Sequence, residues 1–432
     1  MHINMNSNYR NIKFIVGKAG TAKTTTIIDT VTKLVTEYTT KTVAIIAFTH
    51  QAINNIKLKL KERERELLDD CNFDKVITKT IHSYFQLVPG EEHEYTKRSI
   101  QLPDYLFVDE ISMIPDQLMK IIFKLVSNQS VLAQQTLTQS KTRCQLILVG
   151  DILQLNPINL ERKPIDINLL SKIKDFNCTF TEALLIADHL SNNVFGYNQF
   201  PKLFDDKPAM TTARSYQQMP QQSSATKMIL RRNFRNNTTV NNIIEDMLKD
   251  PSNYAKYAFT DWNHIDDYVV ISSKYSTLKE VYAKTKHNGI YLLNTLLGYV
   301  SCKIGDKMIL TESLDKDFVN GDIVEIVSNN TIRSVNCEEQ KTYSFINTKC
   351  LPLLPYNYLT IHKSQGLGFD KVIVVLDNLF EITMLYTAMT RAKVDLKFIL
   401  LNPEELDRLK IYTSAFNKLE RLIYEEITEN SQ

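Results

Sequence analysis

The sequence predicts an α/β fold with parallel sheets, and two observations lead to this prediction. Seven short apolar runs, rich in Val, Ile and Phe, show no alternation of apolar with polar residues, as expected for strands that are covered on both faces. These runs span residues 12–16, 43–48, 105–108, 146–149, 268–272, 372–376 and 396–401. Helical periodicity lies between many of them; Ile27, Val31 and Leu34, for example, recur at the spacing of one helix face. Strands that alternate with helices are typical of α/β proteins.

Length and composition limit the class of protein. The chain has 432 residues, of which 43% are hydrophobic and 23% charged, and this favours two or three domains with ordinary cores. A formal net charge of +2 excludes a strongly basic scaffold but leaves room for a local basic groove. The six cysteines form no C-x-x-C pair, which argues against a zinc ribbon and favours a reducing compartment.

No targeting or membrane segment is visible in the sequence. The first residues lack the apolar segment of a signal peptide, and no apolar run reaches the ~20 residues of a membrane helix. We therefore expect a soluble intracellular protein of the nucleus or cytoplasm of a host, without membrane contact. The abundance of Asn, Ile and Lys suggests an AT-rich genome, such as that of a virus or phage.

The pattern along the chain predicts two α/β cores, each with a small insert. The first core spans residues 1–160 and contains a hairpin insert at about 88–100. Residues 161–228 form a connecting region of helix and loop, whose second half is rich in Gln, Ser, Pro and Met. The second core spans residues 229–432, and short alternating strands with turns predict a small β-barrel insert at about 301–350.

Polar residues follow the carboxyl ends of the first four predicted strands, where open α/β sheets bind their ligands. They are Lys23 and Thr24, Thr49 and His50, Asp109 and Glu110, and Gly150 and Asp151. Four strands that deliver polar groups to one edge predict a shared site.

The loop between the first strand and the first helix has the composition of a phosphate-binding loop. It consists of Gly17, Lys18, Ala19, Gly20, Thr21, Ala22, Lys23 and Thr24. In such a loop the backbone amides and the helix N-terminus hold the phosphates, the lysine reaches the β- and γ-phosphates, and the hydroxyl after it binds Mg²⁺. Ala22 stands where glycine is usual, and alanine there could tighten or distort the loop.

Acidic and amide side chains complete the predicted ATP site. Asp109, at the end of a buried strand, is suited to hold Mg²⁺, and Glu110 is suited to orient and deprotonate the attacking water. Gln154 follows the next strand of the pattern, and its amide is suited to sense the γ-phosphate. We therefore expect ATP and Mg²⁺ as the nucleotide and metal.

The order of these motifs resembles that of the superfamily 1 helicases. After the phosphate loop come AFTHQA (47–52), TIHS (80–83), DEISM (109–113), GDILQLNPI (150–158), LRRNFR (230–235), TIHKSQGLGFD (360–370) and LYTAMTRAK (385–393). Within that superfamily the chain is most similar to the RecD-like, Pif-type and Dda-like branch, whose members move 5′ to 3′ on single-stranded DNA.

This resemblance implies a fold and further site residues. The two cores would be RecA-like cores of the P-loop NTPase class, and the barrel would be SH3-like. Arg235 and Arg391 would serve as arginine fingers, and Phe234 would stack on adenine unless it is an ordinary core phenylalanine. Thr25, Gln365 and Gly366 complete the implied ATP-binding set. ATP would close the cleft between the cores and hydrolysis would open it.

The chain departs from the family in one further respect. The family has a glutamine upstream of the phosphate loop that reads adenine, but none of the sixteen residues before Gly17 is Gln. The expected consequence is loose discrimination between bases, unless the true start of the protein lies upstream.

Hydrogen-bonding residues after other strands predict a nucleic-acid track that grips phosphates without sequence specificity. They are Thr49, His50, Thr80, His82, Thr360, His362 and Lys363. A lone histidine is more often structural, but the block Thr-Ile-His occurs in both cores. The hairpin at 88–100 is expected to act as a wedge that separates the duplex, with a plain surface hairpin as the alternative.

The predicted function is therefore that of an ATP-dependent DNA helicase. It would act as a monomer on single-stranded DNA and duplex junctions, moving 5′ to 3′, with replication or repair proteins as candidate partners. Two alternatives stay open: a viral-type superfamily 1 RNA helicase, because nothing in the sequence shows recognition of the 2′-hydroxyl, and a nucleotide-gated clamp with little turnover, suggested by Ala22.

Overall fold

The structure, a computed structural model, describes residues 12–87, 101–126, 144–155 and 227–424. Within these ranges residues 39, 68–72, 116–117, 120, 123–124, 152, 286, 288, 336–340, 347–349 and 380–381 are not described. Two compact units are present, one made of Met1–Asn233 and Asn417–Gln432 and the other of Phe234–Phe416. The predicted hairpin at 88–100 and nearly all of the predicted connecting region 161–228 lie outside the described residues.

The first unit is built on a six-stranded parallel sheet with the order β3-β2-β4-β5-β1-β6. Its strands are β1 (Ile12–Gly17), β2 (Val43–Ala47), β3 (Val76–Thr80), β4 (Tyr105–Asp109), β5 (Gln145–Gly150) and β6 (Lys227–Leu230). All five residues of β2 are buried, as expected for a central strand covered on both faces. β3 is an edge strand whose burial alternates in part, so its sequence lacks the continuous apolar run that predicts a strand.

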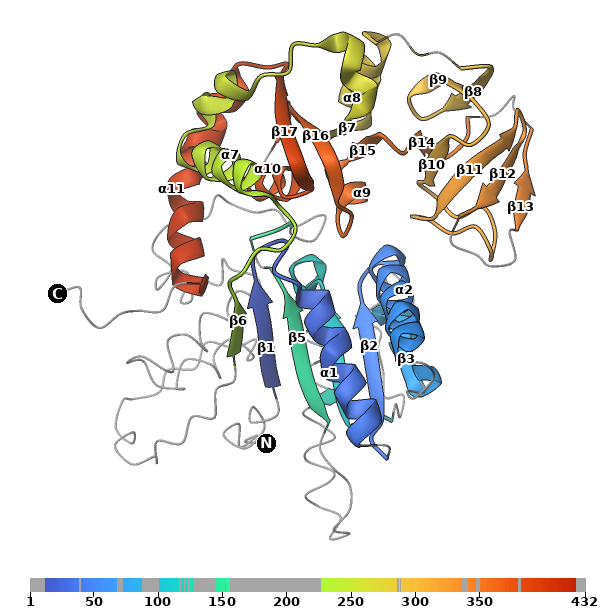
Figure 1. Cartoon of the computed structure of the whole chain (residues 1–432), viewed down its shortest axis with the longest axis vertical. Coiled ribbons are helices and arrows are strands. Elements are labelled where there is room, and N and C mark those ends of the chain that lie inside the picture. The colour runs from blue at the N-terminus through green and yellow to red at the C-terminus, as the bar shows by residue number, and fades with distance from the viewer. Residues whose placement is uncertain are drawn as a thin grey trace, which may run out of the picture. The chain divides into compact units, whose positions relative to one another are not determined.

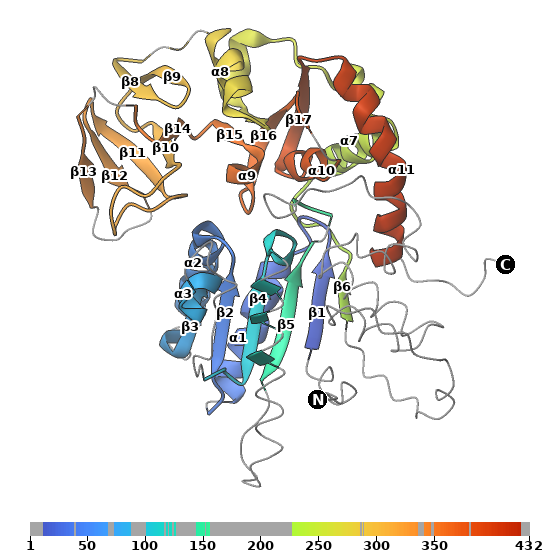
Figure 2. The same ribbon diagram turned by 180° about the vertical axis from the view of Figure 1, so that it is seen from behind.

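Three helices of this unit follow strands β1, β2 and β3 of the sheet. They are α1 (Lys23–Glu37), α2 (His50–Glu66) and α3 (Ile81–Phe85), and the 3₁₀ turns are η3 (Phe73–Lys75) and η5 (Ile111–Met113). α1 lies in front of the sheet in Figure 1 and behind it in Figure 2, so it covers one face. Its buried residues Ile27 and Val31 join Ile45 of β2 in one core, and this confirms the predicted helix face.

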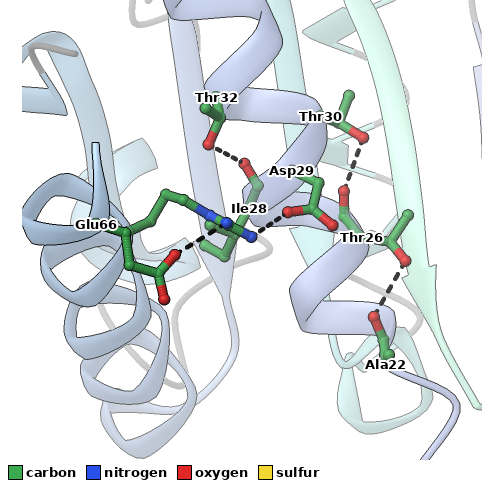
Figure 3. A network of polar contacts seen from close by, with 8 residues as sticks. Ala22, Thr26, Ile28, Asp29, Thr30, Thr32 and Glu66 are labelled. Atoms are coloured by element: carbon green, nitrogen blue, oxygen red, sulfur yellow. Dashed lines mark hydrogen bonds and ion pairs between the residues drawn. The ribbon is translucent and has the colours of Figure 1, made fainter. Parts of the chain in front are cut away.

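An exposed ion-pair cluster joins α1 to α2. Arg63 of α2 pairs with Asp29 of α1 and, at 3.0 Å, with Glu66 of its own helix (Figure 3). Because exposed ion pairs typically contribute at most ~1 kcal/mol, the shared apolar core rather than this cluster holds the two helices together.

The second unit contains a four-stranded parallel sheet with the order β15-β7-β16-β17. The strands are β7 (Val269–Ser272), β15 (Tyr358–Thr360), β16 (Phe369–Leu376) and β17 (Ala392–Leu400). The helices are α7 (Thr238–Lys249), α8 (Tyr275–Ala283), α9 (Ile361–Ser364), α10 (Ile382–Met389) and α11 (Glu404–Tyr424), with 3₁₀ turns η8 (Pro251–Tyr257) and η9 (Trp262–Asp267). α11 begins among the residues of the second unit and ends among those of the first. All seven apolar runs of the sequence form strands in the two parallel sheets, so the predicted α/β class is confirmed.

The insert of the second unit is antiparallel. A hairpin of β8 (Tyr291–Thr295) and β9 (Gly298–Cys302) precedes a five-stranded sheet with the order β13-β12-β11-β10-β14 (Figure 1). Its strands are β10 (Lys307–Leu310), β11 (Ile323–Ser328), β12 (Thr331–Ser334), β13 (Thr342–Ser344) and β14 (Leu353–Pro355). The antiparallel strands thus reach from 291 to 355, beyond the expected 301–350, and the SH3-like form stays a prediction. No helix in the described part of the chain is long and apolar enough to cross a membrane.

Candidate active site

The predicted phosphate loop lies between β1 and α1 and is tightly folded. A Cβ atom on Gly17 would lie 2.3 Å from Thr21 Oγ1 and 2.8 Å from Leu230 O, so only glycine fits at that position. The Thr21 hydroxyl donates to Lys18 O at 2.8 Å. The ammonium of Lys23 donates to Gly17 O (2.8 Å) and to Lys18 O (2.9 Å), so its charge lies directly against the loop. This arrangement fits a loop that holds phosphate at the N-terminus of α1.

Ala22 adopts the left-handed backbone conformation, with φ 62° and ψ 29°. α1 nevertheless starts at the next residue, and its first turn is closed by Thr26, whose amide and hydroxyl both donate to Ala22 O, at 2.9 and 3.1 Å (Figure 3). The loop therefore accommodates the alanine without losing the helix start. The cost is local strain of about 1–2 kcal/mol, which a glycine would not have.

We expect the Ala22→Gly variant to be slightly more stable than the natural chain. Relief of the strain is partly offset because glycine adds about 0.4–1 kcal/mol of unfolded-chain entropy. The net gain should be about 0.5–1 kcal/mol, or roughly 2 °C in the midpoint of thermal unfolding. The control is Ala52→Gly inside α2, where glycine should lower the midpoint. A lower midpoint for both variants would contradict the strain at Ala22.

Asp109 and Glu110 follow β4 at the same edge of the sheet. Burial and the neighbouring Glu110 charge raise the pKa of Asp109 to about 7, while Lys23 and Lys59 act in the opposite direction. Glu110 is itself left-handed, with φ 54° and ψ 47°, and its buried Oε2 has no hydrogen-bond partner among the described residues. Strained non-glycine residues of this kind cluster at functional sites.

The loop after β5 supplies a second buried acceptor that has no partner among the described residues. Asp151 is fully buried, and its carboxylate accepts from Leu153 N (3.1 Å) and from Gln154 Nε2 (3.3 Å). Because a carboxylate only accepts, the amide of Gln154 turns its NH₂ group to Asp151 and its Oε1 away from it. This Oε1 is buried and without a partner in the described structure. Leaving a buried acceptor without a hydrogen bond costs about 1–3 kcal/mol. We therefore expect a ligand or a water molecule to donate a hydrogen bond to this Oε1.

Strand order brings these groups together. β4 lies beside β5, and β5 lies beside β1, all parallel. Their carboxyl ends therefore place Asp109, Gln154 and the phosphate loop at one edge. β2 adjoins β4, so Thr49 and His50 follow at that edge.

In the second unit, Gln365, Gly366, Arg235 and Arg391 gather around the loop of residues 365–368. Arg391 is 1% exposed; it donates from Nε to Thr387 O (2.9 Å), from Nη1 to Leu367 O (3.2 Å) and from Nη2 to Thr390 Oγ1 (3.1 Å). The buried amide of Gln365 has no partner for either of its polar atoms within the described structure.

Arg235 and Phe234, two of the predicted ATP-site residues of this unit, are adjacent in the chain. A Cβ atom on Gly368 would lie 3.6 Å from Arg235 Cδ, so Arg235 packs beside the same loop. Phe234 is 62% exposed, which does not support the alternative of an ordinary core phenylalanine.

The three threonines of the predicted nucleic-acid track are helix caps. Thr49, Thr80 and Thr360 precede α2, α3 and α9, and their hydroxyls accept from the backbone N–H three residues later, at 3.2, 3.3 and 3.4 Å. Thr80 and Thr360 are also buried. The repeated Thr-Ile-His block is thus a strand end, a cap and a buried isoleucine in each unit, and sequence analysis did not anticipate the capping.

The basic residues that follow these caps differ in their surroundings. His50 is exposed at the start of α2, whereas the His82 ring lies 5.8 Å from the ring of Phe48. Burial lowers the pKa of His362, which favours the neutral form of its imidazole. Partial burial also lowers the pKa of Lys363, whose ammonium donates to the side-chain oxygen of Asn320 in the insert.

Two family models match the chain. Residues 3–159 match an AAA domain, and residues 358–398 match the UvrD-like helicase C-terminal domain. Both matches agree with the resemblance to the superfamily 1 helicases. The two matched domains indicate an ATP-hydrolysing helicase. No curated protein sequence matches the chain significantly.

Solved structures of Pif1 helicases share the fold of this helicase. Bacteroides Pif1 bound to single-stranded DNA is 16% identical, with a TM-score of 0.54 over 93% of this chain and 92% of that chain. Bacteroides sp. Pif1 in complex with ADP-AlF4 is 16% identical, with a TM-score of 0.51 over 97% and 95% of the two chains. At this identity the likeness confirms the predicted pair of RecA-like cores.

Proposed function

We propose that this helicase uses ATP hydrolysis to move along single-stranded DNA in the 5′ to 3′ direction and to unwind duplex DNA at junctions. The observation that supports the proposal most directly is the set of polar residues at the carboxyl ends of the strands in the first sheet. There Lys23, Asp109 and Gln154 follow three neighbouring strands, and the buried Oε2 of Glu110 and Oε1 of Gln154 have no hydrogen-bond partner among the described residues. Pif1 structures of the same fold contain single-stranded DNA or ADP-AlF4.

Each residue of this edge has a proposed role in phosphoryl transfer. The backbone of residues 17–25 binds the phosphates, and Lys23 neutralises their charge. Glu110 orients the attacking water and removes its proton, while the Oε1 of Gln154 accepts from the same water. Thr24 and Asp109 would hold Mg²⁺, which when bound neutralises charge on the phosphate oxygens.

The second unit supplies the remaining proposed groups. Arg235 and Arg391 stabilise the charge that develops on the γ-phosphate, because phosphoryl transfer is catalysed mainly by positioning and electrostatics. Gln365 and Gly366 contact the nucleotide from their loop, and the exposed ring of Phe234 stacks on the base.

DNA contacts are proposed for the first turns of α2, α3 and α9. The capping threonines hold these turns in place, and the polar side chains that follow them meet the DNA phosphates. His50, His82, His362 and Lys363 are these side chains.

The test is steady-state ATP hydrolysis by the purified chain, alone and with single-stranded DNA or RNA at low salt, followed by unwinding of 5′- and 3′-tailed duplexes. We expect strong stimulation by DNA and unwinding of the 5′-tailed duplex. Lys23→Ala is the control, because loss of its ammonium should remove turnover. Stimulation by RNA alone would favour an RNA helicase, and ATP binding without turnover would favour a clamp. Unwinding of only the 3′-tailed duplex would reverse the proposed direction.

A further inference from the structure

The last turns of α11 contact two loops of the candidate active site. The hydroxyl of Tyr424 donates to Asp151 Oδ1 at 2.6 Å, and one turn earlier Glu420 pairs with Lys18 of the phosphate loop. Because residues 420 and 424 are four apart, they lie on the same face of the helix. These contacts fall within the first unit, to which residues 417–432 belong.

Tyr424 makes a buried hydrogen bond to Asp151. Both Tyr424 and Asp151 are buried, at 6% and 0% exposed, so their hydrogen bond is shielded from water. The two oxygens are 2.6 Å apart, which is at the short end of the range for hydrogen bonds between oxygens. The two residues are 273 positions apart in the chain, so this bond depends entirely on the docking of α11.

The position of Asp151 determines how Gln154 is presented. Its Oδ1 is held by Tyr424 and by Leu153 N, which leaves Oδ2 directed at Gln154 Nε2. The amide of Gln154 is thereby fixed with Oε1 on the opposite side, where this atom has no partner in the described structure. Without the Tyr424 hydroxyl, Asp151 would lose one of these three donors, and the rotation of its carboxylate would be less restricted.

We propose that Tyr424 is a positioning residue for ATP hydrolysis, which acts through Asp151 to hold the Gln154 amide with its oxygen toward the attacking water. The inference rests on the proposed function and adds to it a residue from the C-terminal helix. Tyr424 itself touches neither nucleotide nor water in this scheme. Its contribution is to keep the buried amide of Gln154 in one of two orientations, which have nearly the same shape but exchange the positions of the oxygen and the nitrogen.

The Tyr424→Phe variant tests the proposal because it removes only the hydroxyl and keeps the ring. We expect kcat for DNA-stimulated ATP hydrolysis to fall roughly tenfold, as is common for residues that orient an active-site group. KM for ATP should stay nearly constant, since the proposed role concerns the reaction and not nucleotide binding. Tyr412→Phe, three turns earlier on α11, is the control and should keep the natural kcat.

A double-mutant cycle with Gln154→Ala separates positioning from a general structural role. If Tyr424 acts through Gln154, Tyr424→Phe should have no further effect on kcat in the Gln154→Ala background. Independent, multiplying losses would overturn the proposal, and so would an unchanged kcat with only a lower thermal midpoint. Absence of turnover in the natural chain would instead overturn the proposed function, and this inference with it.

Discussion

Replacement of Glu110 with glutamine should reduce DNA-stimulated ATP turnover by about 10²–10⁴-fold, the usual contribution of a general base. Glutamine keeps the size of the side chain and one hydrogen-bonding oxygen, but it cannot accept the proton of the attacking water. The buried Oε2 of Glu110 has no partner in the described structure, so no internal hydrogen bond is lost with it. ATP should therefore still bind, and the variant should accumulate in an ATP-bound state that holds DNA tightly.

Single-turnover hydrolysis and fluorescence anisotropy of labelled single-stranded DNA measure these two effects. The matched control is Glu62→Gln, a change of the same chemistry at an exposed position of α2. Natural turnover in Glu110→Gln would exclude Glu110 as the base, and weak DNA binding in the presence of ATP would contradict the trapped state.

Replacement of Arg391 with lysine should lower kcat by about 10³-fold or more, since arginine fingers contribute about 10³–10⁵-fold in related phosphoryl transfers. Lysine keeps the positive charge but cannot reproduce the planar fork, which here donates in three directions to Thr387, Leu367 and Thr390. The affinity for ATP should change far less than kcat. Equal losses in both would make Arg391 a binding residue only.

Because Arg391 is buried, its replacement also destabilises the second unit, and this effect must be separated from catalysis. Thr277→Val is a suitable control: it removes the partly buried 2.7 Å hydrogen bond from the hydroxyl of the buried Thr277 to Asp377 Oδ2 in the same unit. Both variants should show a lower thermal midpoint, but only Arg391→Lys should lose turnover when assayed well below that midpoint. A similar loss of kcat in Thr277→Val would mean that stability, rather than the guanidinium, controls the rate.

Much of the fold follows from local pattern. Central strands such as β2 are covered on both faces, and such strands therefore consist of consecutive apolar residues. β3 escaped prediction because an edge strand has a less apolar pattern, and the insert ran beyond its expected limits. The turns and alternation that predicted it were clearest only between residues 301 and 350.

In the candidate active site too, some features were predicted from the local sequence and others were visible only in the folded structure. The composition of residues 17–24 predicted a phosphate loop, but not that Ala22 would be left-handed, since residue type alone does not determine φ. The Thr-Ile-His blocks were correctly noticed as repeated, yet their threonines are caps, a role that depends on where each helix begins.

The sequence by itself determined that the seven apolar runs form strands, which loop resembles a phosphate site and which acidic and amide residues follow those strands, because each of these depends on neighbours along the chain. The tertiary structure alone decided the order of the strands, which places β4 and β1 on either side of β5. It also decided the burial of Arg391 and the bond between Tyr424 and Asp151. Such contacts join residues far apart in the chain, and the packing of whole elements, not any local pattern, brings them within bonding distance.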